Sequence, residues 1–466
     1  MTMRPAIPFS NNGFMPITRL VAAVGALVVG ATAAVEAGET FGAESFTLDN
    51  GLQVVVVSNH RAPVVHHAVW YRVGAADERP GESGIAHMLE HMMFKGTATV
   101  PAGEFSKIVS RNGGTDNAFT SHDYTGYFQN IARDRLEIVM EMEADRMVNL
   151  AFSDKDFVTE RDVVLEERRS RTDNRPRALF SEQVNAAQYL SHPYRLPIIG
   201  WEHEIRGFDR DAALAFYRTY YVPNNAVLMV IGDITAAELR PLAERYFAAL
   251  KSRPVPERAR PQEPPQRAAR RVEMTDARVA NPEWSRGYIA PSYRTDPDGH
   301  ALALDVLTEI LGGGTTSRLY QALVVEQKIA DQAGANYNGG TYDPTRFAIF
   351  AMPRAGADPA AVEAAVEAEI ARLITDGVGD DELARVKFGI KARTIYARDS
   401  LYMIARIFGG ALTAGLTVDD VESWPRRIEA VTAAQVVAAA KAMLRPEHAV
   451  TGLLLPAAAS PDSPPS

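Results

Sequence analysis

The sequence contains no cysteine among its 466 residues. Disulfide frameworks, thiolate metal sites, cysteine nucleophiles and a lipid-anchored cysteine are therefore excluded. A metal ion in this protein must be held by histidine, aspartate or glutamate side chains.

Positive charge is also in short supply. The chain has 49 Lys and Arg against 58 Asp and Glu, which makes a net charge of −9. Proteins that bind nucleic acid neutralise its phosphates with a clustered basic surface, so this balance argues against nucleic acid as a partner. The hydrophobic share of 46% is enough to fill packed cores, and the length allows two or three domains.

The apolar run near the N-terminus, Leu20–Val29, is too short to cross a bilayer, which takes roughly 20 residues. Arg19 precedes the run, and small residues at Ala31–Ala33 or Val35–Ala37 suit a cleavage site. This pattern predicts a signal peptide over residues 1–37, export to the periplasm, and a mature chain without a stable membrane span.

The rest of the chain alternates strand-like and helix-like segments. An Asn50-Gly51 turn lies between two strand-like runs, and the segment 251–272 is rich in proline and charge, as an exposed linker is. These signals predict an α+β protein with an N-terminal domain over 38–250 and a C-terminal domain over 273–455, joined by a linker over 251–272 and followed by a disordered tail over 456–466.

The two halves share a pattern of apolar residues. The segment His87–Thr97, set against Asp305–Thr315, keeps the apolar spacing and the closing Gly-Thr, whereas its polar chemistry is lost. We therefore expect two homologous domains, each a mostly antiparallel sheet packed with helices, of which only the first carries the chemistry.

His87, Glu90 and His91 form an H-x-x-E-H pattern inside a helix-like segment. Residues at i, i+3 and i+4 share one helix face, so the three side chains project together. Two imidazoles one turn apart can bind a Zn²⁺ ion and leave positions for a third protein ligand and a water. Glu90 can then act as the base that takes a proton from the water.

A third ligand is available on the segment 159–169, where Glu160 and Glu167 lie two helical turns apart and point the same way. Either carboxylate can reach a metal. The competing interpretation is an ordinary solvated helix whose acidic residues pair with neighbouring arginines.

A glycine-rich turn at Gly113-Gly114 leads into a β-prone strand. A strand with an open edge near a metal can bind an extended peptide through main-chain hydrogen bonds. We predict that Asn117, Ala118 and Phe119 contact substrate in this way; on its own the segment is equally a plain hairpin.

Together these residues resemble the insulinase/pitrilysin family of inverzincin metallopeptidases, and among its branches the bacterial proteins similar to the β subunit of the mitochondrial processing peptidase. The resemblance extends from about Phe46 to about Leu455 and is carried by the segments Glu82–Thr97, Asn117–Thr120, Glu160–Val164, Tyr220–Ala226 and Gly314–Tyr320. It implies zinc held by His87, His91 and Glu167, with Glu166 as the fallback ligand and Glu160 as a residue that orients a histidine. It also implies that pairs of domains close around unfolded peptides.

One departure from the family pattern concerns substrate positioning. Members of the family carry an Arg and a Tyr, seven residues apart, in the C-terminal half, to hold the substrate carbonyl near the metal. The corresponding segment here, Ala322–Ala330, contains neither residue type, and Leu323 and Ala330 are assigned to the two positions. We therefore expect a homologous subunit without a metal site to supply them in a heterodimer, or otherwise a homodimer.

The function that these patterns predict is a zinc-dependent endopeptidase that hydrolyses peptides or short unfolded polypeptides with a metal-activated water. The alternative is a non-catalytic scaffold, or a core subunit that binds zinc or peptide without hydrolysis. A subunit without activity has no physical reason to keep three mutually positioned polar groups in a packed helix. The presence of these groups therefore favours the enzyme.

Overall fold

The computed structural model describes residues 40–457. The predicted signal peptide over 1–37 and nearly all of the predicted tail over 456–466 lie outside the described residues, so both stay predictions.

Two β-sheets organise the described chain. The N-terminal sheet has the strand order β1-β2-β6-β3-β5-β4, in which β2 and β6 run parallel and the other neighbours run antiparallel. Its strands are β1 (Ala43–Thr47), β2 (Gln53–Ser58), β3 (Val64–Tyr71), β4 (Thr115–Thr120), β5 (Thr125–Ala132) and β6 (Ala226–Gly232).

The C-terminal sheet has the order β7-β11-β8-β10-β9, again with one parallel pair, β7 with β11. Its strands are β7 (Arg270–Asp276), β8 (Glu283–Ala290), β9 (Ala330–Asn336), β10 (Thr345–Pro353) and β11 (Ala449–Pro456). Without β1, the two sheets have the same topology. In each, the five strands counted along the chain lie side by side in the order first, last, second, fourth, third. The predicted duplicated α+β fold is thereby confirmed.

Helices of the N-terminal half pack on one face of the first sheet and enclose a large apolar core. Turns or short 3-10 segments border several of these helices, for example Arg133–Arg135. The helices are α1 (Ile85–Met92), α2 (Glu104–Arg111), α3 (Leu136–Asn149), α4 (Asp154–Arg168), α5 (Pro176–Gln188), α6 (Glu202–Gly207), α7 (Arg210–Tyr220) and α8 (Ala236–Phe247).

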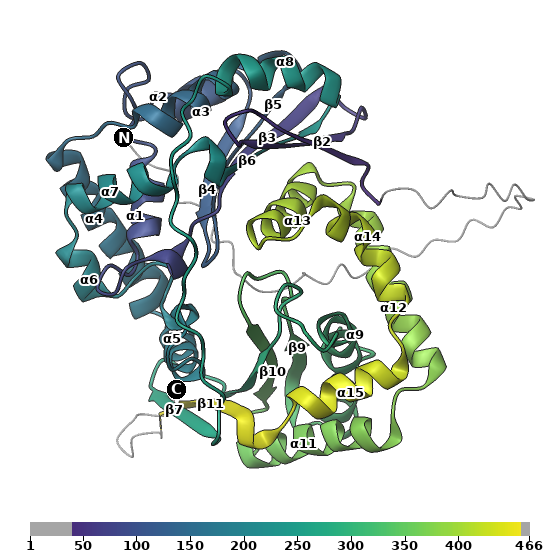
Figure 1. The fold of residues 1–466 in the computed structure, drawn as a ribbon. Helices are drawn as coiled ribbons and strands as arrows, with labels where there is room; N and C mark the ends of the chain where they lie inside the picture. The colour runs from purple at the N-terminus through teal and green to yellow at the C-terminus, as the bar shows by residue number, and fades with distance from the viewer. Residues whose placement is uncertain (1–39, 458–466) are drawn as a thin grey trace, which may run out of the picture. The chain divides into compact units, whose positions relative to one another are not determined.

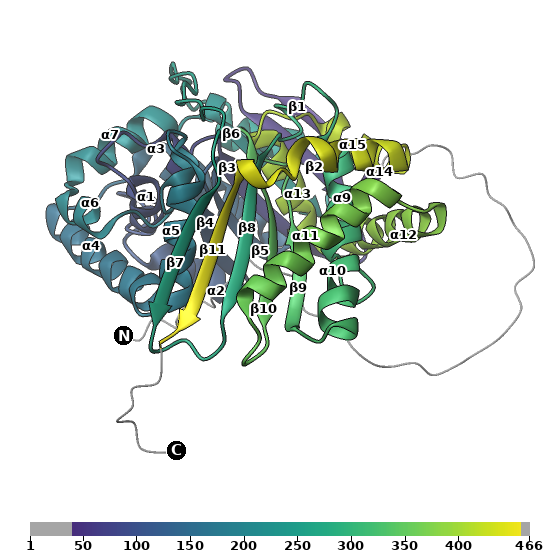
Figure 2. The ribbon, with the colours of Figure 1, turned by 90° about the horizontal axis from the view of Figure 1, so that it is seen from below.

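The C-terminal half encloses a second core in the same way. Its helices are α9 (Ala301–Gly312), α10 (Arg318–Tyr320), α11 (Pro359–Asp376), α12 (Asp380–Ala397), α13 (Leu401–Thr413), α14 (Val418–Glu429) and α15 (Ala433–Met443). Figure 2 shows α9, α11 and α15 beside the strands of this sheet.

Each half lends one helix to the free face of the other half's sheet. Ile404 and Phe408 of α13 pack against Trp70 on the N-terminal sheet, and Figure 1 shows α13 beside that sheet. Conversely, Phe180 and Val184 of α5 pack against Leu454 of β11. The second face of each sheet is therefore covered in part by a helix of the other half.

The segment between α8 and β7 contains no helix or strand, and β7 begins at Arg270, inside the range predicted as linker. Arg260 of this segment is buried and forms ion pairs with Asp77 and Asp123 of the N-terminal half and with Asp343 of the C-terminal half. The ion pairs of Arg260 therefore attach this segment to both halves.

Among the described residues, no single helix has the length and hydropathy needed to cross a bilayer. The pair α13 and α14 meets the length and composition test only jointly, and it is bent by 107° between its two members.

Candidate metal centre

Helix α1 carries the H-x-x-E-H residues, and a close approach of the backbone positions its first turn. Gly84 precedes the helix with φ of 96°, and a Cβ atom there would lie 2.4 Å from the carbonyl oxygen of Ile199. Only glycine combines this left-handed conformation with this contact. The helix can therefore start close to the segment that leads into α6.

Two carboxylates from other segments cap the start of α1. Glu78 accepts hydrogen bonds from the backbone N–H groups of Gly84 and Ala86, each at 2.9 Å, and Glu204 accepts one from Ser83 N–H at 2.6 Å. Acidic side chains at this end also match the helix dipole. Burial raises the pKa of Glu78, although these hydrogen bonds oppose the shift. The orientation of α1 is thus set by side chains that lie outside it.

His87, His91 and Glu167 converge, because α1 packs against α4. The His91 Nε2 atom lies 3.2 Å from Glu167 Oε2, and the His87 Nε2 atom lies 3.9 Å from Glu167 Oε1. Donor atoms around a tetrahedral Zn²⁺ ion are roughly 3.3 Å apart, given metal–ligand bonds of about 2.0–2.1 Å. All three donor atoms lie within 4.8 Å of one another. Two imidazoles and one carboxylate at this spacing fit the ligand set of a catalytic zinc site.

Glu160 orients one of the two rings. Its Oε1 atom lies 2.8 Å from His91 Nδ1, and its other oxygen pairs with Lys95. Because a carboxylate can only accept, the proton of His91 is held at Nδ1, and Nε2 is left to face Glu167. Glu160 is therefore positioned for the orienting role that the resemblance implies, with both of its oxygens engaged by His91 and Lys95.

The pKa values of the two histidines are shifted in opposite directions. Burial lowers the pKa of His87 to about 3, and the charge of His91 lowers it further. Burial also opposes charge on His91, but hydrogen bonds to Glu160 and Glu167 raise its pKa to about 10. For Glu167, burial is outweighed by the hydrogen bond to His91 and the nearby histidine charges, and its pKa falls to about 2. The site thus favours a net positive charge beside these carboxylates, which a divalent cation supplies in place of the proton.

Glu90 lies on the same face of α1 as the two histidines. The hydroxyl of Thr120 donates a hydrogen bond to Glu90 Oε2 at 2.5 Å. Burial raises the pKa of Glu90, which makes it a stronger base than a solvated glutamate. A carboxylate in this position can accept a proton from a water beside the cluster.

The structure separates Glu167 from the fallback ligand, Glu166. Glu167 has 13% of its side chain exposed and faces the histidines, whereas Glu166 has 70% exposed and pairs with Arg169. Adjacent helical residues point about 100° apart, so only one of them can face α1. The structure brings Glu167, and not the fallback Glu166, to the cluster.

Strand β4 is an edge strand whose neighbour among the described strands is β5. Thr120 at its end contacts Glu90, so the free edge begins beside the cluster. Asn117 is exposed, whereas the Phe119 ring packs on Trp70 and lies under the guanidinium of Arg406. The backbone of residues 117–119 thus lies on the free edge of the sheet, but the Phe119 side chain is turned into the protein.

Three polar residues of the site were not singled out from the sequence: Thr120, Lys95 and Arg171. Arg171 pairs with Glu167 across one helical turn. Its spacing of four residues after Glu167 was a usable signal, whereas the contacts of Thr120 and Lys95 depend on how β4 and α4 pack against α1.

The segment expected to lack the substrate-positioning pair forms a π-helical turn, Gln321–Glu326, that leads toward β9. Leu323 and Ala330 have no exposed surface and belong to the second core, so neither side chain is presented at a surface that a substrate could contact. If the family pattern is aligned two residues further along the chain, the exposed Val325 and Gln332 occupy the Arg and Tyr positions instead. Neither is Arg or Tyr, so the departure from the pattern remains.

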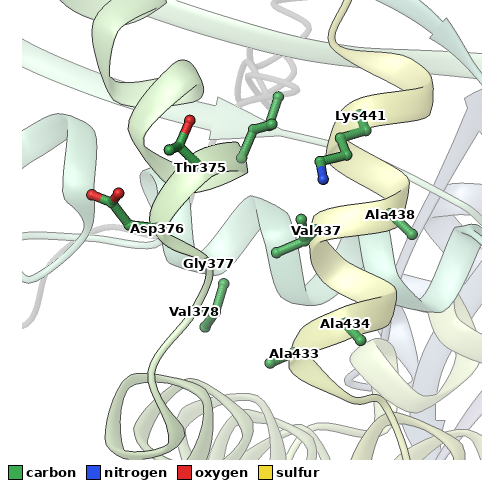
Figure 3. A pocket seen from close by; sticks show the side chains of 10 residues that line it. Thr375, Asp376, Gly377, Val378, Ala433, Ala434, Val437, Ala438 and Lys441 are labelled. Atoms are coloured by element: carbon green, nitrogen blue, oxygen red, sulfur yellow. The ribbon is translucent and has the colours of Figure 1, made fainter.

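A groove in the C-terminal half, of about 530 Å³, shares no residue with the histidine cluster. It lies between the end of α11 and α15, and Lys441 reaches into it beside four alanines and valines of the same helix (Figure 3). With Lys441 and Asp376 as its charged residues, the groove offers no ligand set comparable to the cluster on α1 and α4.

Comparison with known proteins places the chain in a family. The model of the insulinase family (peptidase family M16) matches residues 53–201, and the model of the M16 inactive domain matches residues 207–390. The chain is 35% identical over 375 residues to the zinc protease PqqE of Helicobacter pylori, covering 79% of this chain and 83% of that protein. It is 28% identical over 357 residues to the uncharacterized zinc protease YmxG of Bacillus subtilis, covering 76% and 84%.

Solved structures agree with the sequence comparison. A protease from Helicobacter pylori superposes with a TM-score of 0.81 at 32% identity and covers 89% of this chain and 99% of its own. The periplasmic protease PqqL from Escherichia coli has the same fold, with a TM-score of 0.76 at 19% identity, but this chain spans only 49% of its length. The chain therefore belongs to the insulinase, or M16, family of peptidases.

Proposed function

We propose that the protein is a zinc-dependent endopeptidase that hydrolyses peptides or short unfolded polypeptides. The observation that carries this proposal is the convergence of His87, His91 and Glu167 with Glu90 on the same face. Relatives of similar length are named zinc proteases, which supports the same metal here.

The residues divide the work in the following way. His87, His91 and Glu167 would hold Zn²⁺, which supplies Lewis-acid polarisation of a peptide carbonyl and lowers the pKa of water. Glu90 takes the proton of the attacking water and later donates it to the departing amine. Glu160 keeps His91 in the orientation that presents Nε2.

The free edge of β4 supports a substrate that binds in an extended form. Main-chain pairing with an edge strand makes little demand on side-chain identity, which suits a peptidase of unfolded segments. Because Phe119 is packed on Trp70, we propose backbone groups of residues 117–119, and the side chain of Asn117, as the contacts.

The test of the base is Glu90→Gln. The variant keeps the shape of the side chain but cannot take a proton, so we expect hydrolysis of a quenched fluorescent peptide to fall at least about 100-fold. Zinc measured by mass spectrometry should remain at the wild-type level. Retained hydrolysis in this variant would remove Glu90 from the mechanism.

We further propose that the chain is exported to the periplasm and works with a homologous metal-free subunit, or otherwise as a homodimer. Support for a second unit comes from PqqL, whose chain is about twice as long as the part that this protein matches. Purification with and without co-purifying homologues, followed by the peptide assay, tests the partner. Activity of the isolated chain as a monomer would contradict it.

A second candidate is a subunit that binds zinc or peptide without hydrolysis. It is favoured by the match of residues 207–390 to an inactive-domain model and by the absence of Arg and Tyr from residues 322–330. Bound zinc without turnover, in the isolated chain and in any mixture, would select this candidate.

A further inference from the structure

A cationic side chain stands beside the proposed metal ligands without a part in the mechanism described so far. The guanidinium of Arg171 pairs with Glu167 Oε1, the same oxygen that lies 3.9 Å from His87 Nε2. Arg171 belongs to a π-helical turn, Arg169–Asp173, that directly continues α4. Such turns interrupt α-helices at a cost and are frequent at functional sites.

The ion pair places the guanidinium on the exposed side of the cluster. Its partner atom, Glu167 Oε1, also faces His87 Nε2, and the side chains are 11% exposed for His87, 13% for Glu167 and 45% for Arg171. Arg171 therefore borders the ligands on the side that is open to solvent, from which a substrate has to approach.

Arg171 also remains accessible, unlike Arg168 and Lys95. Its side chain is 45% exposed, whereas Arg168 is buried and pairs with Glu182 and with the carbonyl of Gly200. Lys95 is held by Glu160 on the far side of His91. A guanidinium has five N–H donors, so the pair with Glu167 leaves donors free for a substrate oxygen.

We propose that Arg171 donates a hydrogen bond to the carbonyl oxygen of the scissile peptide and stabilises the negative charge that develops there. This inference rests on the proposed peptidase function and deepens it. It gives the chain, within its own zinc-bearing half, a cation of the kind that stabilises an oxyanion in acyl transfer.

The electron and proton balance needs no additional reactant. The water oxygen bonds to the carbonyl carbon, its proton passes to Glu90, and the carbonyl π pair moves to the oxygen that faces Arg171. The pair then re-forms the carbonyl, the C–N bond breaks, and the amine takes the proton from Glu90. Arg171 keeps all its protons throughout.

The competing role for Arg171 is structural, as a counter-ion that only holds Glu167 in place. The two roles differ in what a substitution changes. A counter-ion affects zinc affinity, whereas an oxyanion donor affects kcat and the binding of a tetrahedral analogue, with zinc content and substrate KM almost unchanged.

The experiment compares Arg171→Gln and Arg171→Lys with Arg169→Gln as the matched control. Arg169 lies in the same π-helical turn and is similarly exposed, but pairs with Glu166, away from the cluster. We expect Arg171→Gln to lower kcat by about 10²–10³-fold, the usual cost of one oxyanion donor, with KM changed less than about threefold. Arg171→Lys should recover part of the loss, and Arg169→Gln should match the wild type.

A second readout does not depend on turnover. A phosphinic peptide, whose tetrahedral anionic group mimics the transition state, should bind Arg171→Gln more weakly by about the same factor as the fall in kcat/KM. An uncleaved peptide should bind Glu90→Gln and the Glu90→Gln/Arg171→Gln double variant equally.

Two results would overturn the inference: unchanged kcat and phosphinic-peptide affinity in Arg171→Gln, or a fall in activity that only follows a loss of zinc. Failure of the peptidase proposal itself looks different, because the wild type would then hydrolyse no peptide and bind the phosphinic and uncleaved peptides with equal affinity.

Discussion

At the scale of single residues, Glu166 and Glu167 show how one position of helical phase separates a ligand from a surface group. They are adjacent and chemically identical, yet one is mostly exposed beside Arg169 and the other faces His91 at 3.2 Å. The sequence left both glutamates as candidate ligands, because it does not determine which side of their helix faces α1. That side is fixed only when the two helices pack together.

This contrast makes a direct prediction about zinc. Glu167→Gln replaces a charged ligand with a weak neutral one, so we expect zinc affinity to fall by more than the 10–100-fold that changes around a ligand typically cost. Competition with a chelator measures the affinity. Glu166→Gln is the control, with unchanged affinity expected, and the reverse result for the two variants would contradict the ligand set.

At the scale of elements, α1 and α9 occupy equivalent places in the two halves but hold different chemistry. Asp305 and Glu309 stand where α1 has His87 and His91. The hydroxyl of Tyr293 donates to Asp305 at 2.5 Å, and Arg393 pairs with Glu309 at 2.7 Å. The polar positions of the duplicated helix are thus kept but satisfied internally, which agrees with the expected loss of the working residues.

Asp305 makes the stability of the folded protein depend on pH. Burial raises its pKa to about 7, and the charge of Glu309 adds to the shift. The unfolded carboxyl ionises near pH 4, so between about pH 4 and pH 7 the folded state holds a proton that the unfolded state has lost. Stability from this group therefore falls as the pH rises through that window.

We predict that Asp305→Asn, which mimics the neutral acid, stabilises the protein at pH 8 and has little effect at pH 4. The gain at pH 8 should be on the order of a few kcal/mol, because one pKa unit corresponds to about 1.4 kcal/mol. Denaturant unfolding at the two pH values measures it. An equal effect at both would show that Asp305 is ionised throughout.

At the scale of the whole described chain, two features join the halves: the exchanged helices α5 and α13, and the buried linker residue Arg260. The Arg260 side chain is 3% exposed and contacts Asp77 at 2.7 Å, Asp123 at 2.6 Å and Asp343 at 2.9 Å. Asp77 directly precedes Glu78, which caps α1. The junction between the halves is therefore connected to the helix that bears the histidines.

Removal of the Arg260 charge should leave three buried carboxylates without their shared cation. We expect Arg260→Met to reduce the free energy of unfolding by about 3–5 kcal/mol, the usual cost of breaking a buried ion pair. Arg445→Met, which breaks the exposed pair with Glu447, should cost less than about 1 kcal/mol. If the two substitutions lowered the free energy of unfolding by similar amounts, the buried Arg260 cluster would contribute no more to stability than an exposed ion pair.

Much of this protein follows from local sequence patterns. The H-x-x-E-H spacing alone places His87, Glu90 and His91 on one helix face, and the two-turn spacing places Glu160 and Glu167 together, because helical periodicity is a local property. The shared apolar pattern of the two halves likewise indicates a duplicated α+β fold, since each pattern reports which face must be buried. The absence of cysteine limits the metal ligands in the same way, without any knowledge of the fold.

Only the tertiary structure decides which of these local groups meet. The choice of Glu167 over Glu166, the contacts of Thr120 with Glu90 and of Arg171 with Glu167, and the burial of Leu323 and Ala330 depend on packing between distant segments. The exchange of α5 and α13 has no local signal, because an apolar helix face does not specify which sheet will cover it. Periodicity determines which side of an element is apolar, whereas the partner of that side is set by the packing of the whole chain.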